Sequence, residues 1–438
     1  MQKMNENLIN IEGLVLRFYT YEGVVQALDG IDLQIKPGEI LGVVGETGCG
    51  KSVTSLSIIG IVPSPGYIEG GKIFFNEEGK EVNLLKQKED YMRSVRGSDI
   101  SMVFQEPRAY LNPVYTVEDQ VGEVLVEHRK KEFIGRAAES MKEEHQQKIE
   151  ESKKKEEEKV QKTIVMHQEK IKELKKKGEK ENREEIEALT SQINELKKKP
   201  VKVHVSPPYR MKLYERWYKK PNGLSIRPLF GIPIAGRILR RPFKKEIRNE
   251  VVSLLKSLGI ADPERVVDMY PHELSGGMAQ RVVIAMALAC NPKLLICDEP
   301  TTNLDVTVQA QILELIRTLR ENFKSAILYI THDLGVIAEL CERVAVMYAG
   351  NVVEVAEIFE LFQKPLHPYT SALLASIPRP GCAFRSIPGI VPSLISPPTG
   401  CRFHERCLYA MDTCMKNKPP LIQADKGHMV ACHLYRGQ

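Results

Sequence analysis

The sequence has no run of about 20 consecutive apolar residues, the length that a membrane-spanning helix needs. Its first ten residues, Met1 to Asn10, are polar and lack the apolar core of a secretory signal. We therefore expect the chain to remain in the cytoplasm. There its 9 cysteines are expected to be thiols or metal ligands rather than disulfides.

An excess of charge of one sign is also lacking. The chain has 62 basic and 57 acidic residues, for a net charge of +5, so composition does not favour a nucleic-acid partner. At 438 residues the chain is long enough to bury at least one large core, and we expect two or three structural units.

Proline is absent and glycine is almost absent between residues 137 and 199, where Glu, Lys and Gln dominate. Such a composition predicts a solvated helix over at least part of this segment. Four apolar residues with a 3-4-3 spacing predict a short coiled-coil seam near its end: Ile186, Leu189, Ile193 and Leu196.

The next segment, residues 200–245, is rich in proline, basic residues and aromatics, and Glu215 is its only acid. The globular pattern resumes near Glu246. Residues 131–245 are therefore interpreted as an insertion into one continuous domain, formed by residues 1–130 and 246–356. A last segment, 357–438, is proline-rich and contains a group of cysteines.

A phosphate-binding loop is predicted near residue 45. Ile40 to Val44 is a continuous apolar run, typical of a buried strand, and Ser52 to Ile61 reads as a helix. The segment between them fits the full pattern G-x-x-x-x-G-K-S: Gly45, Glu46, Thr47, Gly48, Cys49, Gly50, Lys51 and Ser52. In such a loop backbone N–H groups point at phosphates, the lysine reaches the β- and γ-phosphates, and the serine binds Mg²⁺. Cys49 most simply replaces a small residue here, with a redox role as the alternative.

A second apolar run, Leu294 to Cys297, ends in two acids. Asp298 is placed to hold the magnesium shell, and Glu299 to polarise the attacking water. The alternative for two acids at a strand end is a solvated terminus, which the intact phosphate loop disfavours.

The segment Leu274-Ser275-Gly276-Gly277 resembles the signature of ATP-binding-cassette (ABC) ATPases. The other motifs of that family follow in order: Gln105 matches the Q-loop, Asn303-Leu304-Asp305 the D-loop, and His332 the switch histidine. The resemblance implies a head-to-tail dimer in which Ser275, Gly276 and Gly277 of one subunit close over ATP held by the other. It also implies that Gln105 senses the γ-phosphate and contributes to the magnesium site, while Glu299 and His332 serve hydrolysis.

Three aromatic residues are candidates for stacking on adenine. Phe18 is favoured by its position before the first strand pair, and Tyr19 and Tyr21 compete with it. Each of the three could instead be a packing residue.

Further segments resemble the ATPases of bacterial and archaeal oligopeptide/dipeptide importers. They are Phe104 to Pro107 with Leu111 to Pro113, Tyr270 to Glu273, His367 to Thr370, Gly400 to His404 and Ala431 to Leu434. The resemblance covers residues 8–130 and 246–435. It implies two membrane permease subunits, a second ATPase that is more often different than identical, and an extracytoplasmic solute-binding protein. It also implies a location at the cytoplasmic face of the membrane. Members of the group carry peptides, nickel or oligosaccharides, so the cargo stays open.

Four cysteines gather in the last 38 residues: Cys401, Cys407, Cys414 and Cys432. Their spacing lacks the close C-x-x-C pairs of most structural zinc sites, whereas irregular spacings occur among iron–sulfur ligands. The resemblance to the importer group implies a [4Fe–4S] cluster, expected to be structural rather than redox-active. Zinc and free or paired thiols remain alternatives, and His404, His428 and His433 leave a mixed ligand set open.

The insertion is the departure from the family, whose compact members have far fewer residues between the Q-loop and the signature. A tolerated solvated arm is one interpretation. Another is that the basic and aromatic residues of 201–245, which include Trp217, Tyr218 and Arg237 to Arg241, contact anionic lipid or the membrane subunits. Nucleic-acid binding by the same patch is the least favoured.

These observations predict an α/β fold of the phosphate-loop NTPase class and ABC type. It would comprise an antiparallel β subdomain, a helical subdomain that carries the insertion, and a cysteine-rich C-terminal extension. The predicted activity is ATP hydrolysis that powers peptide import. A DNA-repair or translation ATPase of the same family is the rival, which the His367-Pro368-Tyr369 segment and the cysteine tail disfavour. A regulatory subunit with an idle site is disfavoured by the intact motifs.

Overall fold

The structure is a computed structural model, and it describes residues 7–178, 181–198, 203, 205–221, 233–302, 304–377 and 387–435. The chain forms two compact units: Met1–His128 together with Val251–Gln438, and Arg129–Glu250. Within the described ranges, no helix is long and apolar enough to cross a membrane.

The first unit is built on an eight-stranded sheet with the order β11-β12-β10-β9-β3-β8-β7-β6. The five strands from β9 to β6 are parallel to one another, and β10, β12 and β11 extend the sheet in antiparallel pairing. The strand bounds are β3 (Ile40–Val44), β6 (Ile100–Val103), β7 (Leu294–Asp298), β8 (Ala326–Thr331), β9 (Arg343–Tyr348), β10 (Asn351–Glu357), β11 (Ile422–Asp425) and β12 (His428–Val430). Every residue of β3, β7 and β8 is buried, as expected for strands covered on both faces.

A smaller antiparallel sheet has the order β2-β1-β4-β5. Its strands are β1 (Ile9–Thr20), β2 (Gly23–Ile35), β4 (Gly66–Glu77) and β5 (Lys80–Asn83). One apolar core joins the two sheets, since Ile9 and Leu28 of the small sheet belong to the same buried cluster as Val43 and Ile296 of the large one. The predicted antiparallel β subdomain is therefore packed directly on the strands that carry the phosphate loop.

Short helices connect these strands within the first unit. They are α1 (Lys51–Ile58), α2 (Glu89–Val95), α3 (Pro107–Tyr110), α9 (Pro263–Val266), α10 (Gly276–Leu288), α11 (Val306–Phe323), α12 (Leu334–Leu340), α13 (Ile358–Gln363), α14 (Pro368–Ala375) and α15 (Asp412–Lys416). Two longer helices, α4 (Val117–Gly178) and α8 (Pro233–Ser257), contribute residues to both units.

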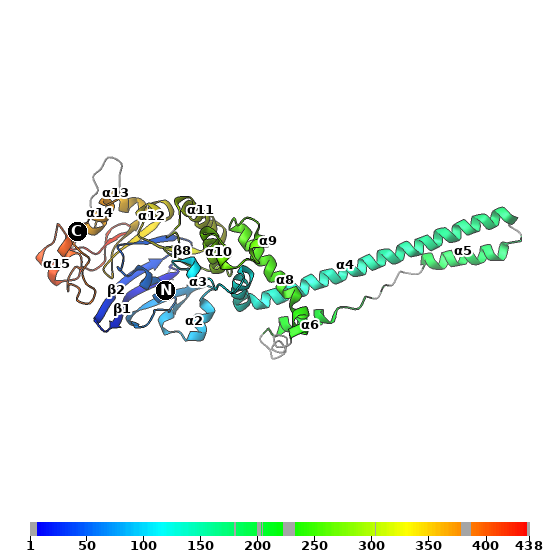
Figure 1. The fold of residues 1–438 in the computed structure, drawn as a ribbon, viewed down its shortest axis with the longest axis horizontal. Helices are drawn as coiled ribbons and strands as arrows, with labels where there is room; N and C mark the ends of the chain where they lie inside the picture. Colours follow the sequence, from blue (N-terminus) through cyan, green and yellow to red (C-terminus); the bar gives the residue numbers. More distant parts are fainter. Residues whose placement is uncertain are drawn as a thin grey trace. The chain divides into compact units, whose positions relative to one another are not determined.

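The C-terminal segment is part of the first unit rather than an appended domain. Strand β12 pairs with β10, where Glu354 lies opposite Val430, so the tail continues the large sheet. The tail also contacts the small sheet, because the N–H of Gln26 donates to the carbonyl of Leu394 at 2.7 Å. Figure 1 shows these late segments beside the N-terminal strands β1 and β2.

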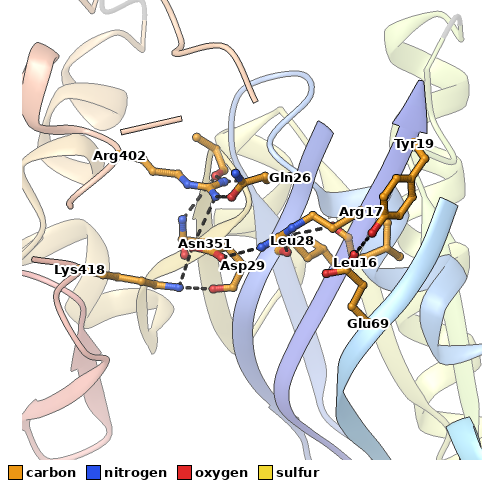
Figure 2. Close-up of polar contacts among 11 residues, drawn as sticks. Leu16, Arg17, Tyr19, Gln26, Leu28, Asp29, Glu69, Asn351, Arg402 and Lys418 are labelled. Carbon is orange, nitrogen blue, oxygen red and sulfur yellow. Dashed lines mark hydrogen bonds and ion pairs between the residues drawn. The ribbon is translucent and has the colours of Figure 1, made fainter. Parts of the chain in front are cut away.

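Asp29 of β2 fastens the tail to the small sheet (Figure 2). Its carboxylate lies 3.1 Å from Arg17, 3.4 Å from Arg402 and 3.3 Å from Lys418. Burial alone would raise the pKa of Asp29, but the charges of Lys418 and Arg402, with hydrogen bonds from Arg17 and Lys418, hold it below its usual value. The side chain of Arg402 is 4% exposed. Two residues of the tail thus complete an ion network that begins in β1.

The second unit contains the insertion predicted over residues 131–245. Helix α5 (Arg183–Lys198) runs beside α4, as Figure 1 shows, and Lys170 of α4 pairs with Glu185 of α5 at 2.9 Å. Leu189 and Ile193, the middle residues of the predicted seam, are buried. Most other side chains of these two helices are exposed, so the hairpin has a thin apolar seam and a charged surface.

Helix α6 (Tyr209–Lys219) changes the interpretation of the basic segment. The interpretation that this segment contacts lipid or a membrane subunit includes Trp217, but its side chain is 5% exposed and its ring packs 4.9 Å from that of Tyr214. The hydroxyl of Tyr214 in turn accepts a hydrogen bond from the N–H of Phe243 at 3.3 Å. Trp217 is therefore a packing residue of the insertion and does not belong to a contact surface.

Candidate nucleotide site

The phosphate loop lies between β3 and α1, as predicted. Gly45 is required by close packing, because a Cβ there would lie 2.1 Å from the carbonyl oxygen of Met347. Gly50 caps α1 with φ 102°, a conformation that favours glycine. The predicted helix 52–61 in fact begins at Lys51 and ends at Ile58.

Lys51 and Cys49 are both buried within this loop. The ammonium of Lys51 donates to the carbonyls of Gly45 at 2.8 Å and Glu46 at 3.3 Å, which keeps it against the loop. Burial raises the pKa of the Cys49 thiol, although the nearby charge of Lys51 opposes that change. A protonated, 1% exposed thiol agrees with Cys49 as a small packing residue.

Two residues predicted to share the magnesium site are brought together across 246 positions of sequence. Ser52 is the second residue of α1, which follows β3, and Asp298 ends β7, two strands away. The Ser52 hydroxyl donates to Asp298 Oδ1 at 3.1 Å. Burial raises the pKa of Asp298, and the charge of Glu299 adds to this, whereas the Ser52 hydrogen bond and the Lys51 charge oppose it. Hydroxyl and carboxylate oxygens are ligands that Mg²⁺ prefers, so this pair fits the ion.

The two predicted hydrolytic residues also meet. Glu299 follows β7 and His332 follows β8, and Nδ1 of His332 lies 3.2 Å from Glu299 Oε1. The hydroxyl of Thr302 donates to the other carboxylate oxygen, Oε2, at 3.2 Å. Glu299 has φ 47°, an uncommon conformation for a residue with a Cβ, and its N–H donates to Ile330 at 2.9 Å. The carboxylate is therefore held from both oxygens at the carboxyl edge of the sheet.

The signature and the D-loop lie at two helix starts. Ser275 caps α10 by accepting a hydrogen bond from the N–H of Met278 at 3.3 Å, and Asp305 caps α11 by accepting from Val308 at 2.9 Å. Both capping residues are exposed. A Cβ on Gly277 would lie 2.9 Å from Val308, so the signature glycine packs against the start of α11. Asn303, predicted with the D-loop, lies outside the described residues.

Gln105 is exposed and follows β6. The segment after it is joined to the signature, because Arg108 donates to the carbonyl of Leu274 at 2.9 Å. Phe104 and Tyr110 stack with ring centroids 4.3 Å apart, which braces the same turn. The roles predicted for Gln105, in magnesium binding and phosphate sensing, stay predictions.

The three aromatic candidates for adenine differ in their surroundings. Phe18 is partly buried against the core. The hydroxyl of Tyr19 donates to Glu69, and its ring contacts that of Tyr67 at 5.9 Å. Tyr21, at the turn between β1 and β2, is 97% exposed. Which of them contacts adenine stays a prediction, and exposure favours Tyr21.

The four tail cysteines lie close enough together to affect the pKa of Cys401. Burial raises the pKa of Cys401 to about 11, and the charges of Cys414, Cys432 and Cys407 add to this, so the four thiols share one neighbourhood. The N–H of Cys401 also donates to the carbonyl of Cys414 at 2.7 Å. Nevertheless, the described part of the chain contains no group of three or more His, Cys, Asp or Glu side chains placed to hold a metal ion.

Each of the three tail histidines already has a partner for one ring nitrogen. His404 contacts the carbonyl of Cys401 at 2.9 Å, His428 contacts Glu354 at 2.7 Å, and His433 contacts the carbonyl of Asn417 at 2.9 Å. These contacts account for one ring nitrogen of each histidine, and Nδ1 of His433 is buried without a hydrogen-bond partner.

Several residues at the phosphate loop were not predicted. Arg406, Tyr348 and Tyr369, all far along the chain, contact Glu46 or one another. Only the resemblance of His367 to Thr370 to a known segment pointed to any of them. Contacts that join residues more than 300 positions apart leave no local pattern in a sequence.

A phosphate loop, a serine–aspartate pair and a carboxylate–histidine pair at one edge of a parallel sheet define a phosphate-loop ATPase. Two family models match this chain: "ABC transporter" over residues 28–162 and 153–302, and "Oligopeptide/dipeptide transporter, C-terminal region" over residues 353–414.

A probable peptide ABC transporter ATP-binding protein of Sinorhizobium fredii is 37% identical over 97% of this chain and 94% of its own length. The oligopeptide transport ATP-binding protein AppD of Bacillus subtilis is 36% identical over 98% of this chain and 97% of its own length. The dipeptide transport ATP-binding protein DppD of the same organism is 35% identical over 98% of this chain and 95% of its own length. The chain belongs to the ATP-binding proteins of ABC transporters, in the group with the oligopeptide/dipeptide C-terminal region.

Proposed function

We propose that this protein is the ATP-hydrolysing subunit of an importer for di- and oligopeptides. The observation that carries the proposal is the match of residues 353–414 to the oligopeptide/dipeptide transporter C-terminal region, on a chain whose hydrolytic residues are intact. Relatives across nearly the whole chain are named for peptide, oligopeptide and dipeptide transport. Nickel or an oligosaccharide is the alternative cargo.

The residues of this chain divide the work of hydrolysis. Loop N–H groups and Lys51 bind the phosphates. Ser52 and Asp298, with Gln105 as a further predicted ligand, would hold Mg²⁺, which would neutralise phosphate charge. Glu299 accepts a proton from the attacking water. Nδ1 of His332 lies 3.2 Å from the Glu299 carboxylate. His332 orients this carboxylate and the γ-phosphate. Ser275 and the glycines after it act on ATP of the other subunit. Ser275 is exposed and the two glycines are partly exposed, which leaves them accessible to that ATP.

We place the protein at the cytoplasmic face of the membrane, with two permease subunits and a second ATPase, and with a solute-binding protein as an indirect partner. The test is to extract the complex from membranes in detergent, identify its subunits and reconstitute it. ATP-dependent uptake of short peptides is the expected result. Uptake of nickel or a sugar instead would replace the cargo, and a complex without permease subunits would overturn the importer role.

The tail cysteines are proposed to bind a [4Fe–4S] cluster, with Zn²⁺ as the alternative. Four thiols in one neighbourhood suit either group, although the side chains are not arranged as a metal site. Cys401, Cys407, Cys414 and Cys432 would be the ligands. The cluster would cross-link the tail between Cys401 and Cys432.

Anaerobically purified protein is expected to contain iron and sulfide and to absorb in the visible range. Replacing Cys401 and Cys414 by Ser should remove the iron, the sulfide and the visible absorption, because only two of the four proposed thiolate ligands remain. Cys341→Ala is the matched control, since this cysteine is buried in the core and should leave the iron content unchanged. Zinc without iron would contradict the cluster.

The insertion is proposed to contact anionic lipid through α6. Four basic side chains are exposed on this helix and at its C-terminal end: Lys212, Arg216, Lys219 and Lys220. Tyr209, at its start, is 74% exposed. Each basic residue near an anionic bilayer contributes about 1 kcal/mol. The buried Trp217 has no part in this contact, and the structure leaves the side chains of Arg237 to Leu239 undescribed.

Reversing three of these charges, with Lys212→Glu, Arg216→Glu and Lys219→Glu, should weaken binding of the complex to vesicles with anionic lipid on the order of 100-fold or more. The matched control reverses three exposed lysines of the charged hairpin, Lys153, Lys154 and Lys155, and should have a smaller effect. Equal vesicle binding by both variants would rule out the lipid contact through α6 and leave only the solvated-arm interpretation. Deleting residues 132–244 without any change in vesicle binding, assembly or transport would do the same.

A further inference from the structure

The second residue of the phosphate loop, Glu46, is held by the C-terminal region. Nη1 of Arg406 lies 3.1 Å from both carboxylate oxygens of Glu46. The side chains are 5% exposed for Arg406 and 27% for Glu46, so the pair is largely shielded from water. A charge pair in such surroundings is screened little by salt, and loss of either partner leaves the other uncompensated.

Arg406 is fixed by more than this pair. Its Nε donates to the carbonyl of Pro388 at 2.9 Å and its Nη1 to the hydroxyl of Tyr348 at 3.2 Å. The guanidinium also lies 5.7 Å from the ring of Tyr348 and 6.0 Å from that of Phe403. The position of Arg406 is therefore set by the tail and by β9, and Glu46 meets a pre-formed partner.

The backbone of Glu46 is held as well. Its N–H donates to the hydroxyl of Tyr369 at 3.0 Å. Tyr369 is fully buried, and burial raises the pKa of its hydroxyl, which is therefore protonated at neutral pH. Tyr369 lies in the first turn of α14, where its own N–H donates to Nδ1 of His367 at 3.0 Å. Burial lowers the pKa of His367 to about 4, so its ring is neutral and this nitrogen can accept.

We propose that Arg406 and Tyr369 are positioning residues of the nucleotide site, which pre-order the phosphate loop through Glu46. The proposal rests on the ATP-hydrolysing role of the chain. A phosphate loop binds by aligning successive N–H groups, and a loop that is already ordered loses less conformational freedom when ATP binds. The C-terminal region of this chain would thereby be a functional part of the ATPase rather than an accessory.

The expected result is a change in ATP affinity with little change in the chemical step. In the assembled transporter, Arg406→Gln should raise the KM for ATP about tenfold and change kcat by no more than about twofold. Tenfold corresponds to about 1.4 kcal/mol. Arg406→Lys, which keeps the charge but not the planar fork, should lie between Arg406→Gln and wild type. Glu46→Gln should match Arg406→Gln, and the double variant should be no worse than either single one.

A control separates positioning from general stability. Arg343 and Glu39 form a similar pair, with Arg343 3.0 and 2.9 Å from the two oxygens of Glu39, at the opposite end of β3 from the loop. Arg343→Gln should lower the unfolding temperature but leave the KM for ATP unchanged. If Arg406→Gln does not fold, Glu46→Gln, whose carboxylate is partly exposed, decides the question. An unchanged KM in Glu46→Gln would overturn the proposal, whereas wild-type complex that does not bind ATP would count against the ATPase role itself.

Discussion

Replacing Glu299 by Gln is expected to abolish ATP turnover while ATP remains bound. The amide has nearly the same shape as the carboxylate and can keep the contacts with Thr302 and His332, each 3.2 Å away. It cannot take a proton from water, however. General-base catalysis contributes about 10²–10⁴-fold, so kcat should fall at least about 100-fold. Phosphate release by the reconstituted transporter gives kcat, and retention of labelled Mg·ATP by the same preparation gives binding.

The control for this variant is Glu314→Gln, which changes a carboxylate of α11 that is 71% exposed. Its kcat should stay within about twofold of wild type. Turnover at the wild-type rate in Glu299→Gln would remove the base role from this residue. Loss of ATP binding along with turnover would show that the carboxylate serves nucleotide binding rather than hydrolysis.

The phosphate loop could be predicted because its signals are local. A buried strand, a glycine loop and a helix follow one another within about twenty residues, and the observed β3 spans the predicted Ile40 to Val44. The helix ends earlier than predicted, at Ile58, and the glycine at position 60 has φ 65°, a conformation that does not continue a helix. The Ser52–Asp298 pair, although distant in sequence, followed from two strand-end motifs, since carboxyl ends of parallel strands lie at one edge.

Two kinds of feature could not be predicted. Arg406 and Glu46 are 360 positions apart, and neither residue lies in a periodic pattern that would indicate the other. Trp217 lies in a basic, proline-rich segment whose composition indicates a surface. It is nevertheless buried, because helix packing around Tyr214 and Phe243 builds a small apolar cluster within the insertion. Local composition reports the average environment of a segment, whereas burial is decided residue by residue through tertiary contacts.

The buried carboxylate of Glu354 connects the tail with the nucleotide site, and its removal should strongly destabilise the protein. Glu354 is fully buried in β10 and accepts three hydrogen bonds: from the N–H of Leu366 at 2.7 Å, from the N–H of His367 at 2.9 Å and from Nε2 of His428 at 2.7 Å. Two of these donors, Leu366 and His367, immediately precede α14, and the third belongs to β12.

Glu354→Ala would leave all three donors without their acceptor in a site that excludes water. Breaking a buried charged network by removing one member costs about 3–5 kcal/mol, and we expect the free energy of unfolding in urea to fall by this amount. Glu357→Ala, an exposed carboxylate three residues further along β10, should change it by less than about 0.5 kcal/mol. Glu354 holds the backbone of His367, His367 accepts from Tyr369, and Tyr369 contacts Glu46 of the phosphate loop. The Glu354 variant should therefore also raise the KM for ATP at temperatures where it remains folded. A destabilised variant with an unchanged KM would show that Tyr369 keeps its hold on Glu46 without the carboxylate.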